Sequence, residues 1–149
     1  MKISASIEGL DEMKAAILYL NNAEAKSVFR GGAAAGAKIV QRYAKAAGPG
    51  GGIGVKIRAD GDSATADIGP LNKNWYYKFA ERGTKTHGPK KKSRKMMIWK
   101  ESGGRFIVAK RVRGIIARPF LGPALEDHLE EVQAAIVAGY QKRLAKVSK

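Results

Sequence analysis

The sequence predicts an α+β fold: a mainly antiparallel sheet of four or five strands, with two N-terminal helices and one long C-terminal helix packed on it. Several short segments alternate apolar and polar residues, which is the period of a half-buried strand. Segments near both ends repeat apolar residues every three or four positions, as helices do. Short turns join the middle segments, so neighbouring strands are expected to run antiparallel. The 149 residues predict a single domain with flexible loops at about 48–54 and 83–95.

The first part of the chain predicts a strand followed by two helices. Residues 2–8 alternate strictly, and Asp11 can cap a short helix after them. A longer helical pattern then runs to about residue 47. Gly32 and Gly36 lie on the apolar face of that helix, where each glycine costs about 1 kcal/mol relative to alanine. They indicate either the close approach of another backbone or a weak, kinked helix.

Two hairpins are expected in the middle of the chain. Residues 55–59 and 64–68 alternate on either side of a Gly-Asp turn and predict the first hairpin. The aromatic run at residues 75–80 predicts a strand, or a short helix leading into one, that fills a core or an interface. Residues 96–99 and 106–109 are β-prone segments around a Gly-Gly turn and predict the second hairpin.

The last element is predicted as one long helix that starts near residues 119–123 and ends at about Lys146. Acidic residues lie in its early turns and basic residues in its last turns, and both groups complement the helix dipole. Its apolar positions keep a period near 3.6 and are Leu121, Leu125, Leu129, Val132, Ile136, Tyr140 and Leu144.

Composition excludes several classes of site. The chain has no cysteine and only two histidines, so disulfide scaffolds, thiolate catalysis, zinc ribbons and multi-histidine metal centres are excluded. No apolar stretch is long enough to span a bilayer and no signal-peptide block is visible, so we expect a protein of the reducing cytoplasm. The run at residues 48–54 lacks the Lys-Ser/Thr of a phosphate-binding loop.

Neither histidine predicts catalysis. His87 lies in a loop amid cations with no carboxylate near it in sequence, and His128 lies beside the apolar stripe of the last helix. No pair of carboxylates or nucleophile–base arrangement is visible. We therefore expect neither an enzyme nor a cofactor.

Positive charge is concentrated in one quarter of the sequence. Lysines and arginines number 28 against 13 acidic residues, and residues 82–118 carry +12 of the resulting +15. This segment could bind phosphates without sequence preference, dock on an acidic protein surface, or remain a solvated loop. The expected basic arm consists of Lys85, Lys90, Lys91, Lys92, Arg94, Lys95, Lys110, Arg111 and Arg113.

A resemblance to a known family rests on the start of the predicted C-terminal helix. Residues 117–125 read Ala-Arg-Pro-Phe-Leu-Gly-Pro-Ala-Leu. This block resembles an "ARPFL-x-PAL" pattern of siphophage-type neck and minor tail proteins, also called tail-completion or head-to-tail joining proteins. Residues 76–84 are similar to that family's aromatic-x-x-Phe/Glu-x-Gly-Thr segment, and residues 7–13 agree as well. The likeness spans about residues 2–144, and the block is its most specific part.

The family motif has a physical interpretation. Pro119 and Pro123 fix φ around a helix start, where a missing N–H costs little. Apolar side chains of the block would anchor the helix on the sheet, and Arg118 can pair with a carboxylate. We expect the block to dock the helix rather than to contact a partner. The motif positions are Phe79, Gly83, Thr84, Arg118, Pro119, Phe120, Leu121, Pro123, Ala124 and Leu125.

The resemblance implies a non-enzymatic morphogenesis protein of the virion neck or tail, made in the host cytoplasm. Several copies would form a homo-oligomeric ring between the capsid portal complex and the tail tube. Its partners would be connector or adaptor proteins, the tail terminator or tube protein, and genome DNA in the lumen, with no membrane. The chain departs from the family at residues 48–54, where a Pro-x-x-Thr-Gly-x-Leu turn is expected, and the basic segment 85–95 is not a family feature.

Two other classes compete with this interpretation. A small basic nucleic-acid-binding protein would use the same segment 82–118, although helix-turn-helix, zinc-finger and RNP patterns are absent. A nuclease or toxin-like enzyme would use it to bind substrate, and the scarcity of histidines and paired carboxylates argues against that class.

Overall fold

A computed structural model of the chain describes residues 15, 17, 19–49, 51–60, 62–89 and 95–147. The chain forms two compact units, which are treated separately below. The first, called here the helical unit, comprises Met1–Asn74 and Phe120–Lys149. The second, called the basic unit, comprises Trp75–Pro119.

The longest element of the helical unit is helix α2, Asn22–Ala47. Its N-terminus carries a capping box, in which the Asn21 side chain accepts from the Glu24 N–H and the Glu24 carboxylate accepts from the Asn21 N–H. Gly48 ends it, donating its N–H to the Ala44 carbonyl. The long helix expected to end near residue 47 is therefore confirmed.

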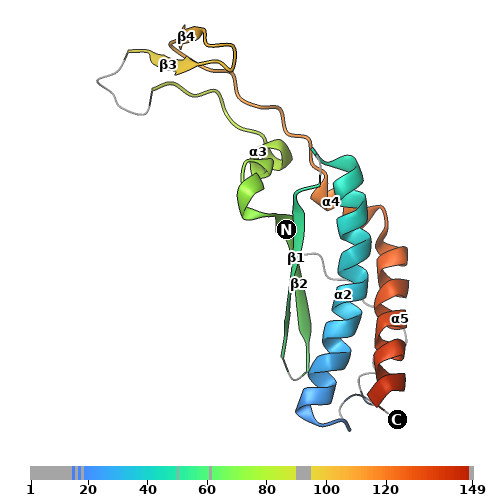
Figure 1. Ribbon diagram of the computed structural model, residues 1–149. Coiled ribbons are helices and arrows are strands. Elements are labelled where there is room, and N and C mark those ends of the chain that lie inside the picture. Colours follow the sequence, from blue (N-terminus) through green and yellow to red (C-terminus); the bar gives the residue numbers. More distant parts are fainter. Residues whose placement is uncertain are drawn as a thin grey trace. The chain divides into compact units, whose positions relative to one another are not determined.

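Helix α5, Leu129–Val147, packs along α2, and Figure 1 shows the two side by side. The packing is close because glycines line it. A Cβ added at Gly139 would lie 2.9 Å from the Gly32 Cα, and one at Gly36 would lie 2.6 Å from Ile136 Cγ1. Gly32 and Gly36 thus make room for the side chains of Tyr140 and Ile136, and the two backbones approach closely at Gly139.

Strands β1, Ile53–Ala59, and β2, Ala64–Pro70, form the first predicted hairpin and pack against α2. Their antiparallel register pairs Val55 with Ile68 and Ile57 with Ala66, so the apolar side chains share one face. Buried residues of the helical unit come from α2, β1, the C-terminal segment and Ile17, which precedes α2 and is 1 % exposed. They include Val28, Phe29, Val40, Ala44, Ile53, Phe120, Ala124 and Val132.

The expected single C-terminal helix is wrong in two respects. It is divided at Asp127 and His128 into α4, Leu121–Glu126, and α5. Both pieces pack against α2 rather than on a broad sheet. The apolar stripe of α5 has the predicted residues, but it faces α2, whose glycines make room for the α5 side chains.

The basic unit contains helix α3, Tyr77–Arg82, and a second hairpin of β3, Met97–Lys100, and β4, Phe106–Ala109. The aromatic run therefore forms the helical alternative of the two expected. A pair of backbone hydrogen bonds between His87 and Val112 joins the segment that enters the β3–β4 hairpin to the segment that leaves it. Among the described residues of this unit, Tyr77 is the one buried large side chain.

The expected sheet of four or five strands is contradicted. In the described part of the chain, the four strands form two separate two-stranded hairpins. Alternation identifies which residues form each hairpin but contains no information on pairing between hairpins, and the two belong to different units. The expected strand 2–8 and most of the expected first helix lie outside the described residues, although Ala15 and Ile17 of that helix are described and are helical.

Candidate interaction surface

Residues 76–84, one of the two segments that carry the resemblance, include α3 and the turn after it. Gly83 has φ of 69° and ψ of 177°, a conformation that favours glycine, and its N–H donates to the Phe79 carbonyl. Thr84 is held on both sides: its N–H donates to the Ile115 carbonyl, and its hydroxyl accepts from the Ile115 N–H at 2.9 Å. These contacts lie within the basic unit. Gly83 and Thr84 therefore help to hold the backbone of the basic unit in place.

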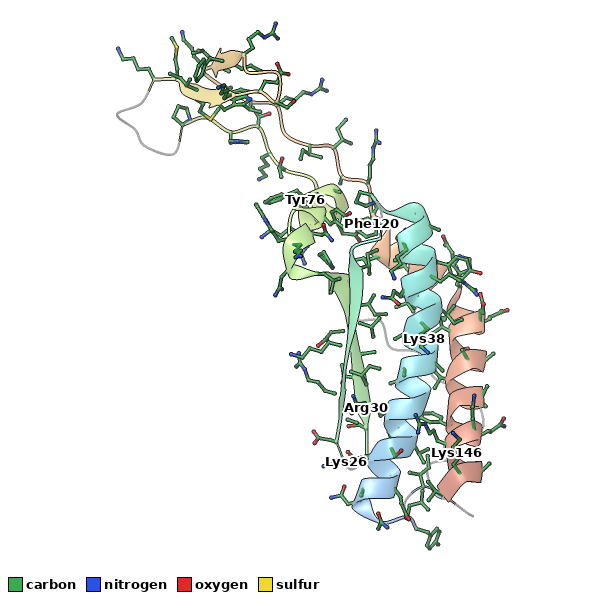
Figure 2. All side chains as sticks on the ribbon, in the orientation of Figure 1. Lys26, Arg30, Lys38, Tyr76, Phe120 and Lys146 are labelled. Atoms are coloured by element: carbon green, nitrogen blue, oxygen red, sulfur yellow. The ribbon has the colours of Figure 1, made fainter. Side chains whose placement is uncertain are left out.

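Residues 117–125, the other segment that carries the resemblance, lead from Arg118 in the basic unit to α4 in the helical unit. Phe120 is 3 % exposed and Ala124 is 4 % exposed, and Phe120 lies against Gly48 at the end of α2. Leu121, Pro123 and Leu125 are half-buried around them, while Arg118 and Pro119 are exposed. Figure 2 labels Phe120 on this segment. The block thus docks α4 on α2, and Arg118 forms no ion pair among the described residues.

The expected basic arm is described only in part. Lys85, Lys95, Lys110, Arg111 and Arg113 are exposed. The remaining members, Lys90, Lys91, Lys92 and Arg94, lie outside the described residues. The basic unit has a net charge of +12, against +3 for the helical unit.

The basic unit also exposes large apolar side chains, which sequence reasoning missed. Of the eleven exposed large hydrophobic residues in the described part of the chain, nine belong to this unit of 45 residues. They are Trp75, Tyr76, Met96, Ile98, Trp99, Phe106, Val108, Ile115 and Ile116. Single exposed apolar residues are ordinary on a protein surface, but nine among 45 residues make this unit the candidate interaction surface.

One face of the β3–β4 hairpin concentrates this apolar surface. The register pairs Ile98 with Val108 and Lys100 with Phe106, and cross-strand partners share a face. Ile98, Phe106 and Val108 are 68 %, 67 % and 53 % exposed. These three residues with Lys100 are called the open face. The sequence signal was present, because both strands are apolar at nearly every position instead of alternating.

The junction of α4 and α5 carries the opposite charge. Residues 126–131 line a surface hollow and include four acidic residues, with Leu129 among them. The Glu131 carboxylate already has two partners: it forms an ion pair with Arg42 at 2.5 Å and accepts a hydrogen bond from the Tyr43 hydroxyl at 2.8 Å. Glu126, Asp127 and Glu130 are exposed and make no ion pair with another described residue. These three residues with Leu129 are called the acidic corner.

Aromatic stacking fixes this junction on α2. The rings of Tyr43 and His128 are stacked, with centroids 3.3 Å apart, and the Arg42 guanidinium lies over Tyr43. Two hydrogen bonds lower the pKa of Glu131 below its ordinary value of 4.5, and the one from Tyr43 has a larger effect than the one from Arg42. The Glu131 contacts therefore stabilise the position of α5 while the carboxyl is ionised.

Comparisons with models of protein families, with curated proteins and with solved structures found no match for this chain. Within the described residues, none of the helices has the length and apolar character needed to cross a membrane. The same residues contain no group of three or more acidic, histidine or cysteine side chains placed to hold a metal ion.

Proposed function

We propose that the protein is a structural component of a siphophage-type neck, and that several copies form a ring joining the capsid portal complex to the tail tube. The proposal originates in the resemblance of residues 117–125 and 76–84 to neck and tail-completion proteins. The observation that carries it is the basic unit. Its described residues include one buried large side chain and nine exposed large apolar side chains. Neighbouring chains that cover this apolar surface would remove it from water.

The architecture supports a role in assembly rather than catalysis. The helical unit is held by α2, α5 and the first hairpin, and its buried side chains are apolar. The basic unit offers a hairpin whose strands are short and whose faces are apolar. An isolated two-stranded hairpin is only marginally stable in water, so contact with a neighbouring chain would stabilise it. In this account the helical unit is the rigid body of each subunit, and the basic unit makes the contacts between proteins.

Nucleic-acid binding is the second candidate, and the net charge of +12 on the basic unit favours it. Such a protein would bind phosphates without sequence preference and would release them as salt rises. Aromatic side chains of the same unit, Trp75 and Tyr76, could stack on unpaired bases. Phe106 could stack in the same way, but the aliphatic Ile98 and Val108 have no such use, so the assembly function accounts for more of the surface.

The two candidates are separated by light scattering on a gel-filtration column, with absorbance recorded at protein and nucleic-acid wavelengths across a range of salt. The proposal expects a closed oligomer of defined mass that is free of nucleic acid. A protein that stays monomeric over the accessible concentration range contradicts a self-assembled ring. A species that retains nucleic acid at low salt and releases it steeply as salt rises supports the second candidate instead.

A further inference from the structure

The open face of the β3–β4 hairpin has a mixed chemistry that limits its partners. Ile98, Phe106 and Val108 form its apolar centre, and the Lys100 ammonium lies 5.8 Å from the centroid of the Phe106 ring. Lys110 and Arg111 follow β4 directly and are exposed. A matching surface must therefore combine apolar contact with negative charge at its edge.

The acidic corner has this combination in the same chain. Glu126, Asp127 and Glu130 surround the hollow in which Leu129 lies, and residues 126–131 contain no lysine or arginine. The corner is thus a strongly negative segment of a chain with a net charge of +15. The two surfaces are complementary in charge, and each has an apolar component.

Other occupants of the open face fit less well. Double-stranded DNA would neutralise the cations through its phosphates but would leave the three apolar side chains without apolar contact. Two hairpins placed face to face would bring Lys100, Lys110 and Arg111 of both copies together, which is repulsive. The acidic corner of a second copy satisfies the charge and offers Leu129 to the apolar centre.

We infer that the open face of one copy docks on the acidic corner of the next copy. The contact is heterologous, since different surfaces of the two copies meet, and a heterologous contact with a suitable rotation closes into a ring. The inference rests on the proposed ring and deepens it by naming the surfaces between subunits.

Charge reversal tests the contact. One variant carries Lys100→Glu, Lys110→Glu and Arg111→Glu, and a second carries Glu126→Lys, Asp127→Lys and Glu130→Lys. Each should weaken self-association, measured by light scattering, roughly 100-fold, because like charges then meet at the contact. A matched control reverses Lys26, Arg30 and Lys38, three exposed cations that Figure 2 labels on α2, and should associate like the wild type.

The decisive result is restoration. A chain carrying both sets of reversals keeps the net charge of +15 and should again form the oligomer. An equimolar mixture of the two single-set variants should also associate, because each then offers the complement of the other. Restoration cannot arise from a folding defect, and circular dichroism checks that each variant is folded.

Apolar contact is tested separately by Ile98→Thr, Phe106→Thr and Val108→Thr, since threonine keeps β-propensity. This variant should associate about 10-fold or more weakly at high salt, where charge is screened. Ile115→Thr with Ile116→Thr removes exposed apolar side chains outside the hairpin and serves as the control.

The outcomes distinguish the inference from the proposed function. A wild-type oligomer that neither set of reversals weakens overturns the contact and leaves the ring standing. A wild type that remains monomeric overturns both. Association that disappears on nuclease treatment shows nucleic acid bridging the copies and also overturns the contact.

Discussion

Gly139 of α5 lies against Gly32 of α2 so closely that a Cβ on Gly139 would come within 2.9 Å of the Gly32 Cα and of the Gly31 carbonyl oxygen. The neighbouring atoms are backbone, which cannot move aside as a side chain can. This contact brings the two longest helices together and sets the position of the apolar stripe of α5. The packing of the helical unit therefore depends on glycines where α5 contacts α2 as well as on its apolar side chains.

Gly139→Ala should destabilise the protein. Alanine favours a helix by about 1 kcal/mol over glycine, but the added methyl overlaps backbone atoms and forces the helices apart. We expect a net loss of about 1–3 kcal/mol in the free energy of unfolding, measured with urea. Gly51→Ala is the control, because a Cβ there meets nothing within 4 Å. Equal stability of both variants would refute the close helix contact.

Phe120→Ala tests whether residues 117–125 dock α4 on α2. The ring is 3 % exposed and packs at the end of α2, so its removal leaves a cavity. We expect a loss of about 3–5 kcal/mol in unfolding free energy, as for other buried phenylalanines. Tyr19→Ala removes a ring that is 93 % exposed and should change little. A loss below 1 kcal/mol in Phe120→Ala would instead point to a role outside the fold.

The contribution of Glu131 to stability should depend on pH. Its pKa in the folded protein lies below its ordinary value of 4.5, so ionised Glu131 stabilises the fold above that pH. As pH falls below 4.5 and through the folded-state pKa, the contribution is lost. Glu131→Gln should therefore be less stable than the wild type at neutral pH and should approach it in acid. Urea titrations at several pH values measure this, and a difference that does not vary with pH would contradict it.

Neutralising the basic arm should block head-to-tail joining without unfolding the protein. The variant replaces Lys90, Lys91, Lys92, Arg94 and Lys95 with glutamine, removing five positive charges of the basic unit. Joining is measured as infectious particles formed when purified protein is added to separated heads and tails. The same change to Lys26, Arg30 and Lys38 of α2 is the control. Normal joining by the arm variant would show that the arm reaches neither DNA nor an acidic connector surface.

Local patterns predicted the elements well, because their causes are local. The end of α2 at Gly48 and the alternation of the first hairpin each depend on residues a few positions apart. The arrangement of those elements depends on contacts distant in sequence. The stripe of α5 is equally compatible with a sheet or a helix, and Gly32 and Gly36 decide for the helix only once their partner is known.

The sequence predicted the charge of the candidate interaction surface but not its exposed apolar residues. The net charge of a segment is the sum of its residues' charges, so the excess of cations in residues 82–118 was visible without a structure. Exposure does not follow from residue type, and Ile98, Phe106 and Val108 were expected to be ordinary hairpin residues. Their common face emerges only from the register of β3 with β4. The acidic residues of the corner were attributed to the dipole of one long helix. That accounts for Glu130 in the first turn of α5, but not for Glu126 and Asp127, which lie at the end of α4.

The most direct test of the central proposal is electron microscopy of lysates from a phage or prophage that carries this gene, with the gene deleted. The account predicts DNA-filled heads and complete tails that remain separate, and it predicts that adding the purified protein joins them. Intact, joined and infectious particles in the absence of the gene would contradict the proposal that this protein connects head to tail.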